Sequence, residues 1–289
     1  MFKGTATALI TPFTNTGIDF DALDKILESQ IDGGVNALVI LGTTGESSTM
    51  TMAEKIAVVD TVVQKLKGKL PIIVGAGANS TATAVDNARV FSSLGVDGLL
   101  VVTPYYNKCT EGGLVAHYTA VADATHLPVI CYNVPSRTGV NMLPRTFLHL
   151  VDNVKNIVGI KEASGNMEQI EECIRLTKGK ADVISGDDSL TVPIMLMGGT
   201  GVISVASNLA PRYVSTMTDC ALKGDCKRAS QMQLDLLPFA KSLFLEVNPI
   251  PVKKGAEMLG LCNGALRLPL TPMTETNAKI LEKTLKDFA

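Results

Sequence analysis

The sequence contains no tryptophan and few other aromatic residues, so its core has to be built from aliphatic side chains. Phenylalanine and tyrosine together make up 4% of the 289 residues, whereas hydrophobic residues in total make up 46%. This composition is typical of parallel strands covered by helices, because strands buried on both faces are rich in valine, isoleucine and leucine. The sequence therefore predicts an α/β protein.

The chain also lacks an excess of charge of either sign. Its 26 Lys and Arg residues nearly balance its 28 Asp and Glu residues, for a net charge of -2. Proteins that bind nucleic acid or anionic lipid usually carry a basic excess, so we expect neither as a partner. No apolar run is long enough to span a bilayer, and residues 1–13 do not have the pattern of a signal peptide.

Metal-ligand and redox patterns are missing as well. The three histidines have no metal-ligand spacing to one another or to a carboxylate, so we expect no metal site. The six cysteines form no CxxC pair and are typical of reduced thiols, which fits a cytoplasmic protein. The glycine-rich segments match neither a dinucleotide-binding fingerprint nor a Walker loop, and no hydrolytic triad is recognisable.

What is present is an alternation of short apolar runs with amphipathic segments, repeated eight times. The predicted strands are residues 5–11, 37–41, 72–74, 98–103, 129–132, 157–161, 182–185 and 201–205. The predicted helices are residues 21–31, 51–66, 81–94, 113–124, 145–150, 167–177, 190–197 and 211–222. Eight such units without a break in composition favour a closed (β/α)8 TIM barrel over an open doubly wound sheet, which usually has fewer strands.

The chain beyond Gly224 shows only helical patterns. Helices are expected at about residues 228–244, 251–259 and 274–288. We therefore divide the chain into a barrel, residues 1–224, and a C-terminal helical region, residues 225–289. The second part is expected to pack on or beside the barrel as an extension.

One charged residue lies where a buried strand should be apolar. Lys161 ends the run 157–160, whose β-branched residues are typical of a strand buried on both faces. A buried ammonium either pairs with a carboxylate or loses its proton, and a neutral lysine amine attacks carbonyl carbons. The simpler interpretation is a lysine whose head reaches water or pairs with Glu162. Strand alternation disfavours that pair, because it places Glu162 on the opposite face.

The barrel hypothesis brings other polar groups to the same place as this lysine. Active sites of such barrels lie at the C-terminal ends of the strands. The residues expected there are Thr43, Thr44, Tyr105, Tyr106, Tyr132, Arg137, Lys161, Gly186, Asp187, Asp188, Ser204 and Asn208. Each of them alone is also consistent with an ordinary turn or a hydrogen-bonded core residue.

Together these residue types suit a Schiff-base enzyme that acts on a small oxo acid. Lys161 would attack the ketone and Tyr132 would shuttle protons. Backbone N–H groups of the turn Thr43-Thr44-Gly45 would bind a carboxylate at a helix N-terminus, and Arg137 could hold a second carboxylate.

Three motifs resemble those of a known enzyme family. They are GTTGES at residues 42–47, YNVPSRTG at residues 132–139 and GIKEASG at residues 159–165. The chain resembles, over essentially its whole length, the dihydrodipicolinate synthase (4-hydroxy-tetrahydrodipicolinate synthase) family. This family belongs to a group of pyruvate-dependent Schiff-base lyases that includes N-acetylneuraminate lyase, and Arg137 favours the synthase within the group.

The resemblance implies a reaction and a role for each site residue. Pyruvate and L-aspartate-4-semialdehyde would condense to 4-hydroxy-tetrahydrodipicolinate, in diaminopimelate and lysine biosynthesis, without a cofactor. Lys161 would form the imine, and Tyr132 would be the general acid/base in a proton relay with Thr43 and with Tyr106 of a neighbouring subunit. The binding residues would be Thr44 for the pyruvate carboxylate, Arg137 for the aspartate-semialdehyde carboxylate, and Gly186 and Ile203 through backbone groups. Members of the family are usually homotetramers built as dimers of dimers, with some homodimers.

The chain departs from the resemblance where lysine-regulated members bind their inhibitor between subunits. Asn79 and Tyr105 match that site, and Ser47 is a further possible remnant of it. Regulated members carry two histidines and a glutamate at positions that hold Met52, Lys55 and Thr83 here. A bound lysine would lose the carboxylate partner of its ammonium and would meet Lys55, so we expect weak or absent inhibition by lysine.

Two alternatives stay open. The first is another lyase of the same group, which cleaves N-acetylneuraminate or a 2-keto-3-deoxy sugar acid. Arg137 argues against it, because a polyol chain needs neutral hydrogen-bonding groups. The second is a non-catalytic barrel that binds a small oxo acid as a sensor, which would form no adduct at Lys161.

Overall fold

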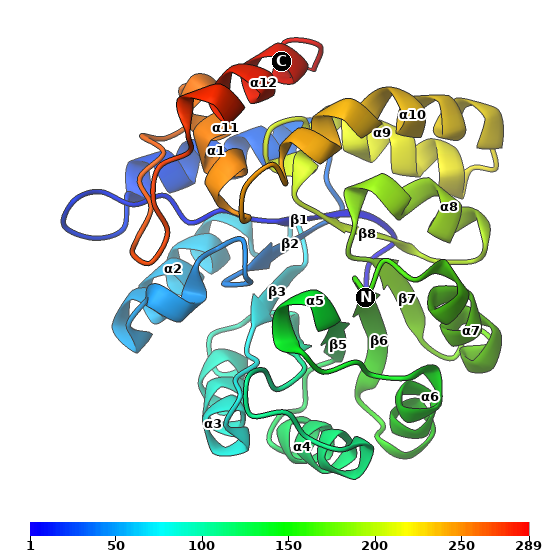
Figure 1. The fold of residues 1–289 in the computed structure, drawn as a ribbon. Helices are drawn as coiled ribbons and strands as arrows, with labels where there is room; N and C mark the ends of the chain where they lie inside the picture. Colours follow the sequence, from blue (N-terminus) through cyan, green and yellow to red (C-terminus); the bar gives the residue numbers. More distant parts are fainter. Residues whose placement is uncertain (289) are drawn as a thin grey trace.

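The computed structural model, which describes residues 1–288, is a closed barrel of eight parallel strands surrounded by helices (Figure 1). In order around the barrel the strands are β1 Gly4–Ala8, β2 Ala37–Ile40, β3 Ile72–Gly75, β4 Gly98–Val102, β5 Val129–Asn133, β6 Ile157–Glu162, β7 Asp182–Ser185 and β8 Gly201–Ser204. Each strand pairs with the next, and β8 closes the barrel on β1. The predicted (β/α)8 fold is confirmed.

Eight helices of the repeating units cover the outside of the barrel. They are α1 Phe20–Gly33, α2 Met52–Leu66, α3 Thr81–Ser92, α4 Glu111–Asp123, α6 Pro144–Asn153, α7 Met167–Thr177, α8 Thr191–Leu196 and α9 Pro211–Leu222. The expected helices are all present, with ends that shift by a few residues. The sequence did not predict the short helix α5, Pro135–Thr138, or the 3-10 turns η1 Ser47–Thr49, η2 Asp188–Leu190 and η3 Ala206–Asn208. All four follow strand ends, where single turns are too short to show a period.

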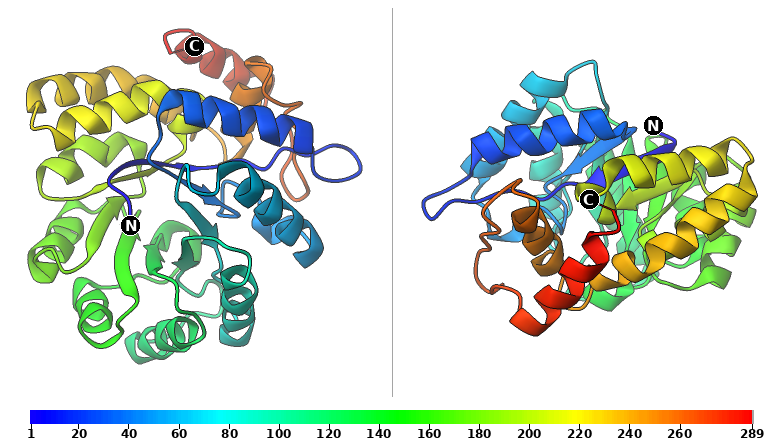
Figure 2. Two further views of the ribbon diagram at one scale, coloured as in Figure 1. Left: turned by 180° about the vertical axis from the view of Figure 1, so that it is seen from behind. Right: turned by 90° about the horizontal axis from the view of Figure 1, so that it is seen from above.

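The C-terminal region forms three helices that gather on one side of the barrel, where they are coloured from gold to red (Figure 2). They are α10 Cys226–Ser242, α11 Ile250–Met258 and α12 Glu275–Leu285. Helix α10 contacts α8, α9 and α12, whereas α11 contacts η3, which directly follows β8. The segment between α10 and α11 is thereby held near the C-terminal ends of the strands. Within residues 1–288, no helix combines the length and the apolar character needed to cross a membrane.

The core has two layers, as a filled barrel requires. One cluster lies between the strands and the outer helices. The other fills the barrel interior and includes Phe2, Ala6, Ala37, Ile73, Leu100, Ile130, Tyr132, Ile184 and Ile203. The barrel interior is therefore packed mainly with apolar side chains.

Candidate active site

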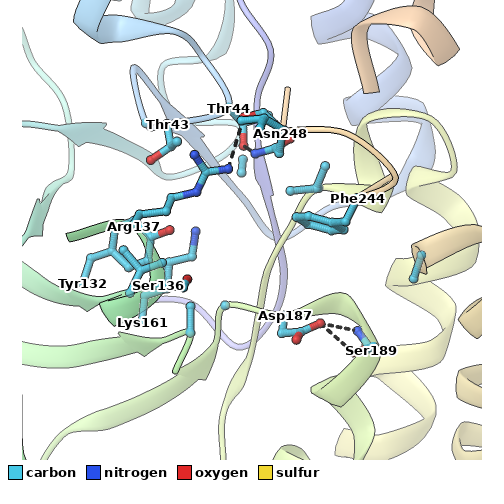
Figure 3. A pocket seen from close by; sticks show the side chains of 18 of the residues that line it. Thr43, Thr44, Tyr132, Ser136, Arg137, Lys161, Asp187, Ser189, Phe244 and Asn248 are labelled. Atoms are coloured by element: carbon cyan, nitrogen blue, oxygen red, sulfur yellow. Dashed lines mark hydrogen bonds between the residues drawn. The ribbon is translucent and has the colours of Figure 1, made fainter. Parts of the chain in front are cut away.

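A cavity of about 860 Å³ opens at the C-terminal ends of the strands (Figure 3). Its polar lining comes from the turn after β2, from β5 and α5, from β6, from the turn after β7, from the end of α10, and from the segment between α10 and α11. These residues are Thr43, Thr44, Tyr132, Ser136, Arg137, Lys161, Asp187, Ser189, Lys241, Glu246 and Asn248. Of the residues that the sequence placed at the barrel mouth, Thr43, Thr44, Tyr132, Arg137, Lys161, Gly186 and Asp187 line this cavity, and the C-terminal segment adds to them. Tyr105 and Tyr106 do not line it, and Asp188, Ser204 and Asn208 are buried and hydrogen-bonded within the protein.

Lys161 lies at the floor of this cavity as a nearly buried side chain, 6% exposed. Its Nζ is 4.3 Å from the centroid of the Tyr132 ring, and the two residues are paired neighbours on β6 and β5. Lys161 forms no ion pair with any residue among 1–288. Its amine is therefore held in the cavity without a carboxylate.

Glu162 points away from the cavity, as strand alternation predicted. Its carboxylate accepts hydrogen bonds from Asn133 Nδ2 at 3.0 and 3.2 Å and from the Ser164 N–H at 2.7 Å. Gln169 Nε2 donates a further bond at 3.1 Å. The carboxylate is fully buried and occupied by these donors, so the interpretation that Lys161 pairs with Glu162 is excluded.

Lys161 fits beneath the loop after β7 because the first residue of this loop, Gly186, has no side chain. A Cβ at Gly186 would lie 3.1 Å from Lys161 Cε and 2.6 Å from Ala163 Cβ. Gly186 lines the cavity, and its N–H donates to the Glu162 carbonyl at 2.8 Å. Ile203 is not among the lining residues and lies deeper, in the interior cluster. Its backbone role stays a prediction.

The turn after β2 has an unusual backbone. Leu41 and Glu46 have φ angles of 55° and 53°, so two non-glycine residues in the left-handed region bracket the turn Gly42–Gly45. The Gly45 N–H donates to the Gly42 carbonyl at 3.1 Å, so the prediction that this amide is free to bind a carboxylate was wrong. The amides of Thr43 and Thr44 have no acceptor within residues 1–288. Only the amides of Thr43 and Thr44 are therefore free to bind a ligand, and the amide of Gly45 is not.

An ion pair that sequence reasoning missed holds this turn in place. Glu46 is buried and lies 2.5 Å from Nζ of Lys253, a fully buried residue of α11. The other Glu46 oxygen accepts a bond from the Arg267 N–H at 3.1 Å. Lys253 also donates to the Ala265 carbonyl at 2.7 Å. The strained turn is thus fastened to the C-terminal region.

Arg137 reaches over the cavity from the short helix α5. Its Nη2 donates to the Asn248 carbonyl at 3.2 Å, which draws the guanidinium towards the C-terminal segment (Figure 3). No carboxylate among residues 1–288 pairs with it. An unpaired guanidinium at the rim of a cavity is suited to bind a carboxylate through two parallel hydrogen bonds.

The two carboxylates in the lining are already occupied. Asp187 Oδ1 accepts bonds from the Ser189 N–H at 2.8 Å and from its hydroxyl at 2.7 Å. Glu246 accepts from Asn277 Nδ2 at 2.8 Å and from Thr274, and these hydrogen bonds lower the pKa of Glu246. Against these two carboxylates the lining sets three basic side chains, Lys161, Arg137 and Lys241, and this excess of positive charge favours an anionic ligand.

Tyr106 is not brought into the cavity by its own chain. It is 90% exposed, has a φ of 71°, and lines neither cavity described here. A large aromatic residue in a strained backbone conformation on the open surface is costly without a partner. The expected role of Tyr106 in a neighbouring subunit's site stays a prediction.

A second cavity, of about 530 Å³, adjoins the first and shares Thr43, Tyr132 and Arg137 with it. It gathers all six residues assigned by resemblance to the region of the lysine-binding site: Ser47, Met52, Lys55, Asn79, Thr83 and Tyr105. Burial lowers the pKa of Lys55. Among the residues that the structure describes, no carboxylate lines this cavity.

Asn248, Lys253 and Arg267 are the functional-site neighbours that the sequence analysis did not find. Helix 251–259 was expected, but Lys253 stands beside Lys254 and the pattern alone does not say which lysine is buried. A weak signal for Lys253 was its place between Val252 and Ala256, both of which are core residues. Asn248 lies in a connecting segment, where no periodicity can be read. No group of His, Cys, Asp and Glu side chains within residues 1–288 is arranged to hold a metal ion.

Comparison with known proteins places this geometry in a family. The family model of the Dihydrodipicolinate synthetase family matches residues 1–288. A 4-hydroxy-tetrahydrodipicolinate synthase of Alkaliphilus oremlandii is 49% identical over 286 residues, which cover 99% of this chain and 98% of that protein.

Solved structures agree with the family model. Dihydrodipicolinate synthase from Thermotoga maritima has a TM-score of 0.98 at 42% identity and covers 99% of this chain and 98% of its own. The enzyme from Acinetobacter baumannii complexed with pyruvate has a TM-score of 0.97 at 41% identity, with 99% of both chains covered. This chain belongs to the dihydrodipicolinate synthetase family.

Proposed function

We propose that this protein is a 4-hydroxy-tetrahydrodipicolinate synthase, a lyase that condenses pyruvate with L-aspartate-4-semialdehyde. The observation that carries the proposal is the amine of Lys161, which lies in the cavity beside Tyr132 and has no carboxylate partner within residues 1–288. The full-length similarity to enzymes of that name supports the same reaction. The reported complex of the Acinetobacter baumannii enzyme with pyruvate supports the choice of the first substrate.

The proposed reaction needs only groups of this chain and its substrates. Lys161 Nζ attacks C2 of pyruvate, and loss of water gives the imine. Loss of a proton from C3 gives an enamine, whose carbon attacks the aldehyde carbon of aspartate-semialdehyde. The amino group of that substrate then attacks C2, which closes the ring and releases Lys161. No cofactor takes part.

The lining residues supply binding and proton transfer in this proposal. The Thr44 hydroxyl and the free amides of Thr43 and Thr44 bind the pyruvate carboxylate, and Arg137 binds that of aspartate-semialdehyde. Tyr132 gives and takes protons at the imine, because its ring lies next to Nζ of Lys161. Thr43 and Tyr106 of a neighbouring subunit complete the relay, so the proposal requires at least a homodimer and is compatible with a homotetramer.

An assay with alternative substrates tests this function against the rival lyases. The purified protein should consume pyruvate and aspartate-semialdehyde together, and it should not cleave N-acetylneuraminate or 2-keto-3-deoxy sugar acids. Cleavage of a sugar acid at a higher kcat/KM than the condensation would transfer the assignment to the alternative. Arg137→Ala is the matched variant, because it should weaken the condensation by raising the KM for aspartate-semialdehyde.

We also propose that lysine inhibits this enzyme weakly or not at all. The second cavity offers Lys55 and no carboxylate to the ammonium of a bound lysine, and two like charges at close range repel each other. Activity should persist through the submillimolar range of lysine, and half-inhibition there would contradict the proposal. The double variant Lys55→His with Thr83→Glu removes the repelling charge and adds a carboxylate, so it should become more sensitive.

Two further features remain proposals. The division into a barrel, residues 1–224, and a C-terminal helical region, residues 225–289, is supported by Gly224, which ends α9 with a φ of 80° just before α10. A cytoplasmic location is supported by six cysteines without a CxxC pair and by the proposed biosynthetic role.

A further inference from the structure

We propose that Asn248 is a positioning residue for pyruvate. Its side chain fixes the direction of the Thr44 hydroxyl, and its backbone carbonyl holds Arg137. This inference rests on the proposed function, since it assigns Thr44 to the pyruvate carboxylate. It concerns a residue of the C-terminal region that lies 204 positions from Thr44 in the chain.

The hydrogen bond between the two side chains leaves the Thr44 proton free for a ligand. Asn248 Nδ2 donates to Thr44 Oγ1 at 3.0 Å, and the two residues are 6% and 4% exposed. A hydroxyl has one proton and accepts through its lone pairs. Because the amide N–H occupies a lone pair, the O–H is directed elsewhere, and within residues 1–288 it meets no acceptor. The cavity, which Thr44 lines, is where a carboxylate would accept it.

The Asn248 amide could present either its Nδ2 or its Oδ1 to the Thr44 hydroxyl, and the observed orientation, with Nδ2 towards Thr44, is the less costly of the two. Its Oδ1 is buried without a partner among the described residues. The reverse orientation would bury an N–H2 group there, and it would turn the Thr44 proton towards Asn248. One unpaired acceptor costs less than two unpaired donors.

The backbone carbonyl of Asn248 holds Arg137, the group proposed to bind the carboxylate of aspartate-semialdehyde. It accepts the bond from Arg137 Nη2 at 3.2 Å (Figure 3). A change of the Asn248 side chain leaves this carbonyl in place. The two effects are therefore separable, and a side-chain variant should affect pyruvate without affecting aspartate-semialdehyde.

The segment does not depend on the Asn248 side chain for its position. Glu246 is bound by Thr274 and Asn277, and Lys253 is paired with Glu46. The Lys253 N–H also donates to the Pro249 carbonyl at 3.0 Å. Variants at Asn248 are therefore expected to fold, so their kinetics report on the site.

Steady-state kinetics of two variants test the proposal. Asn248→Leu removes the amide at similar size, and it should raise the KM for pyruvate about tenfold, as loss of one oriented hydrogen bond does. Asn248→Asp accepts the Thr44 proton and should raise this KM further. For both variants, the KM for aspartate-semialdehyde should stay within about twofold and kcat within about threefold, since Arg137 and Lys161 are untouched.

A double-mutant cycle separates positioning from general damage. Thr44→Val removes the hydroxyl, so adding Asn248→Leu to it should raise the KM for pyruvate no further. The proposal would be overturned if the double variant raised the KM for pyruvate by the product of the two single effects. It would also be overturned if Asn248→Leu raised the KM values for pyruvate and aspartate-semialdehyde equally.

Borohydride trapping of pyruvate keeps this proposal apart from the proposed function. A wild-type protein that traps no pyruvate defeats the function itself. If the wild type traps pyruvate, and Asn248→Leu reaches half-maximal trapping at the same pyruvate concentration as the wild type, then only the role of Asn248 is contradicted.

Discussion

Two buried lysines in this protein differ in whether a carboxylate lies beside them. Lys161 on β6 and Lys253 on α11 both place Nζ over an aromatic ring, at 4.3 Å from the Tyr132 centroid and 3.9 Å from the Phe13 centroid. Lys253 also has the Glu46 carboxylate and the Ala265 carbonyl as partners, whereas Lys161 has no carboxylate within residues 1–288. Burial lowers the pKa of Lys253, and the attraction of Glu46 opposes that effect.

The difference shows how one residue type serves two purposes. A buried ammonium with a carboxylate and a carbonyl is fixed in place, and its role is to hold the strained turn after β2 against the C-terminal region. A buried lysine without such partners leaves its Nζ available to a ketone. Replacing Lys161 should therefore abolish chemistry and spare the fold, while replacing Lys253 should damage the fold first.

The largest expected effect is on activity at Lys161. Lys161→Ala should lower kcat/KM for the condensation by at least about a thousandfold, because the nucleophile is lost. The unfolding free energy should be unchanged or slightly higher, since an unpaired buried amine is removed. Denaturant unfolding followed by circular dichroism, beside the kinetic assay, checks both parts. An inactive variant that is also much less stable would contradict the comparison.

The largest expected effect on stability is at Lys253. Lys253→Met leaves Glu46 buried without its cation, which should lower the unfolding free energy by about 3–5 kcal/mol. The double variant Lys253→Met with Glu46→Gln removes both charges and should recover at least half of the loss. A single-variant loss below about 1 kcal/mol in denaturant unfolding would show that the pair is not structural.

A smaller effect is expected where the backbone makes room for Lys161. Gly186→Ala introduces a Cβ at 2.6 Å from Ala163 Cβ and 3.1 Å from Lys161 Cε. Displacement of the amine should lower kcat about tenfold, and overpacking should cost about 1–3 kcal/mol. Gly17→Ala is the matched control, because nothing lies within 4 Å of its added Cβ. Equal kinetics of the two variants would argue against tight placement of the lysine.

The smallest effect is expected at the partly exposed ion pair between Glu54 and Arg267. Hydrogen bonds from Arg267 lower the pKa of Glu54 to about 2, and the two side chains are 24% exposed. A depressed carboxylate pKa adds stability above the unfolded value of about 4.5, and this stability is lost as the pH falls towards 2. At pH 7 the unfolding free energy of the wild type should exceed that of Glu54→Gln by about 1 kcal/mol. The difference is small because water screens this partly exposed ion pair.

The pH profile gives the check on this pair. The advantage of wild type over Glu54→Gln should shrink between about pH 4.5 and pH 2, where Glu54 takes up its proton. An advantage that stays constant over this range would mean that the ion pair contributes nothing. Wild type and variant are compared at each pH, so that the titration of other groups cancels.

The sequence was sufficient to predict the barrel and one half of the site. Tyr132 and Lys161 lie at the ends of strands, Thr43 and Arg137 follow shortly after strands, and barrel geometry brings such positions together. Their local patterns carry the needed information, since each lies within a few residues of an apolar strand.

The other half depends on contacts over more than two hundred residues. Asn248 and Lys253 meet Thr44 and Glu46 through tertiary packing, and nothing in either local pattern specifies a partner. The Gly45 amide was missed for a different reason: its bond to the Gly42 carbonyl is local, but it depends on the backbone angles of the turn, which the residue types alone do not specify. Tyr106 is exposed and lies outside the cavity of its own chain, so its predicted role in a neighbouring subunit cannot be read from one chain.

The central claim is that Lys161 is the amine that reacts with a ketone. Incubation of the protein with labelled pyruvate and borohydride, followed by peptide mapping, should give a single stable adduct on the peptide that contains Lys161. Lys161→Arg should give none, because a guanidinium stays protonated and forms no imine. Absence of an adduct in the wild type, or an adduct at Lys253 or another lysine, would contradict the account.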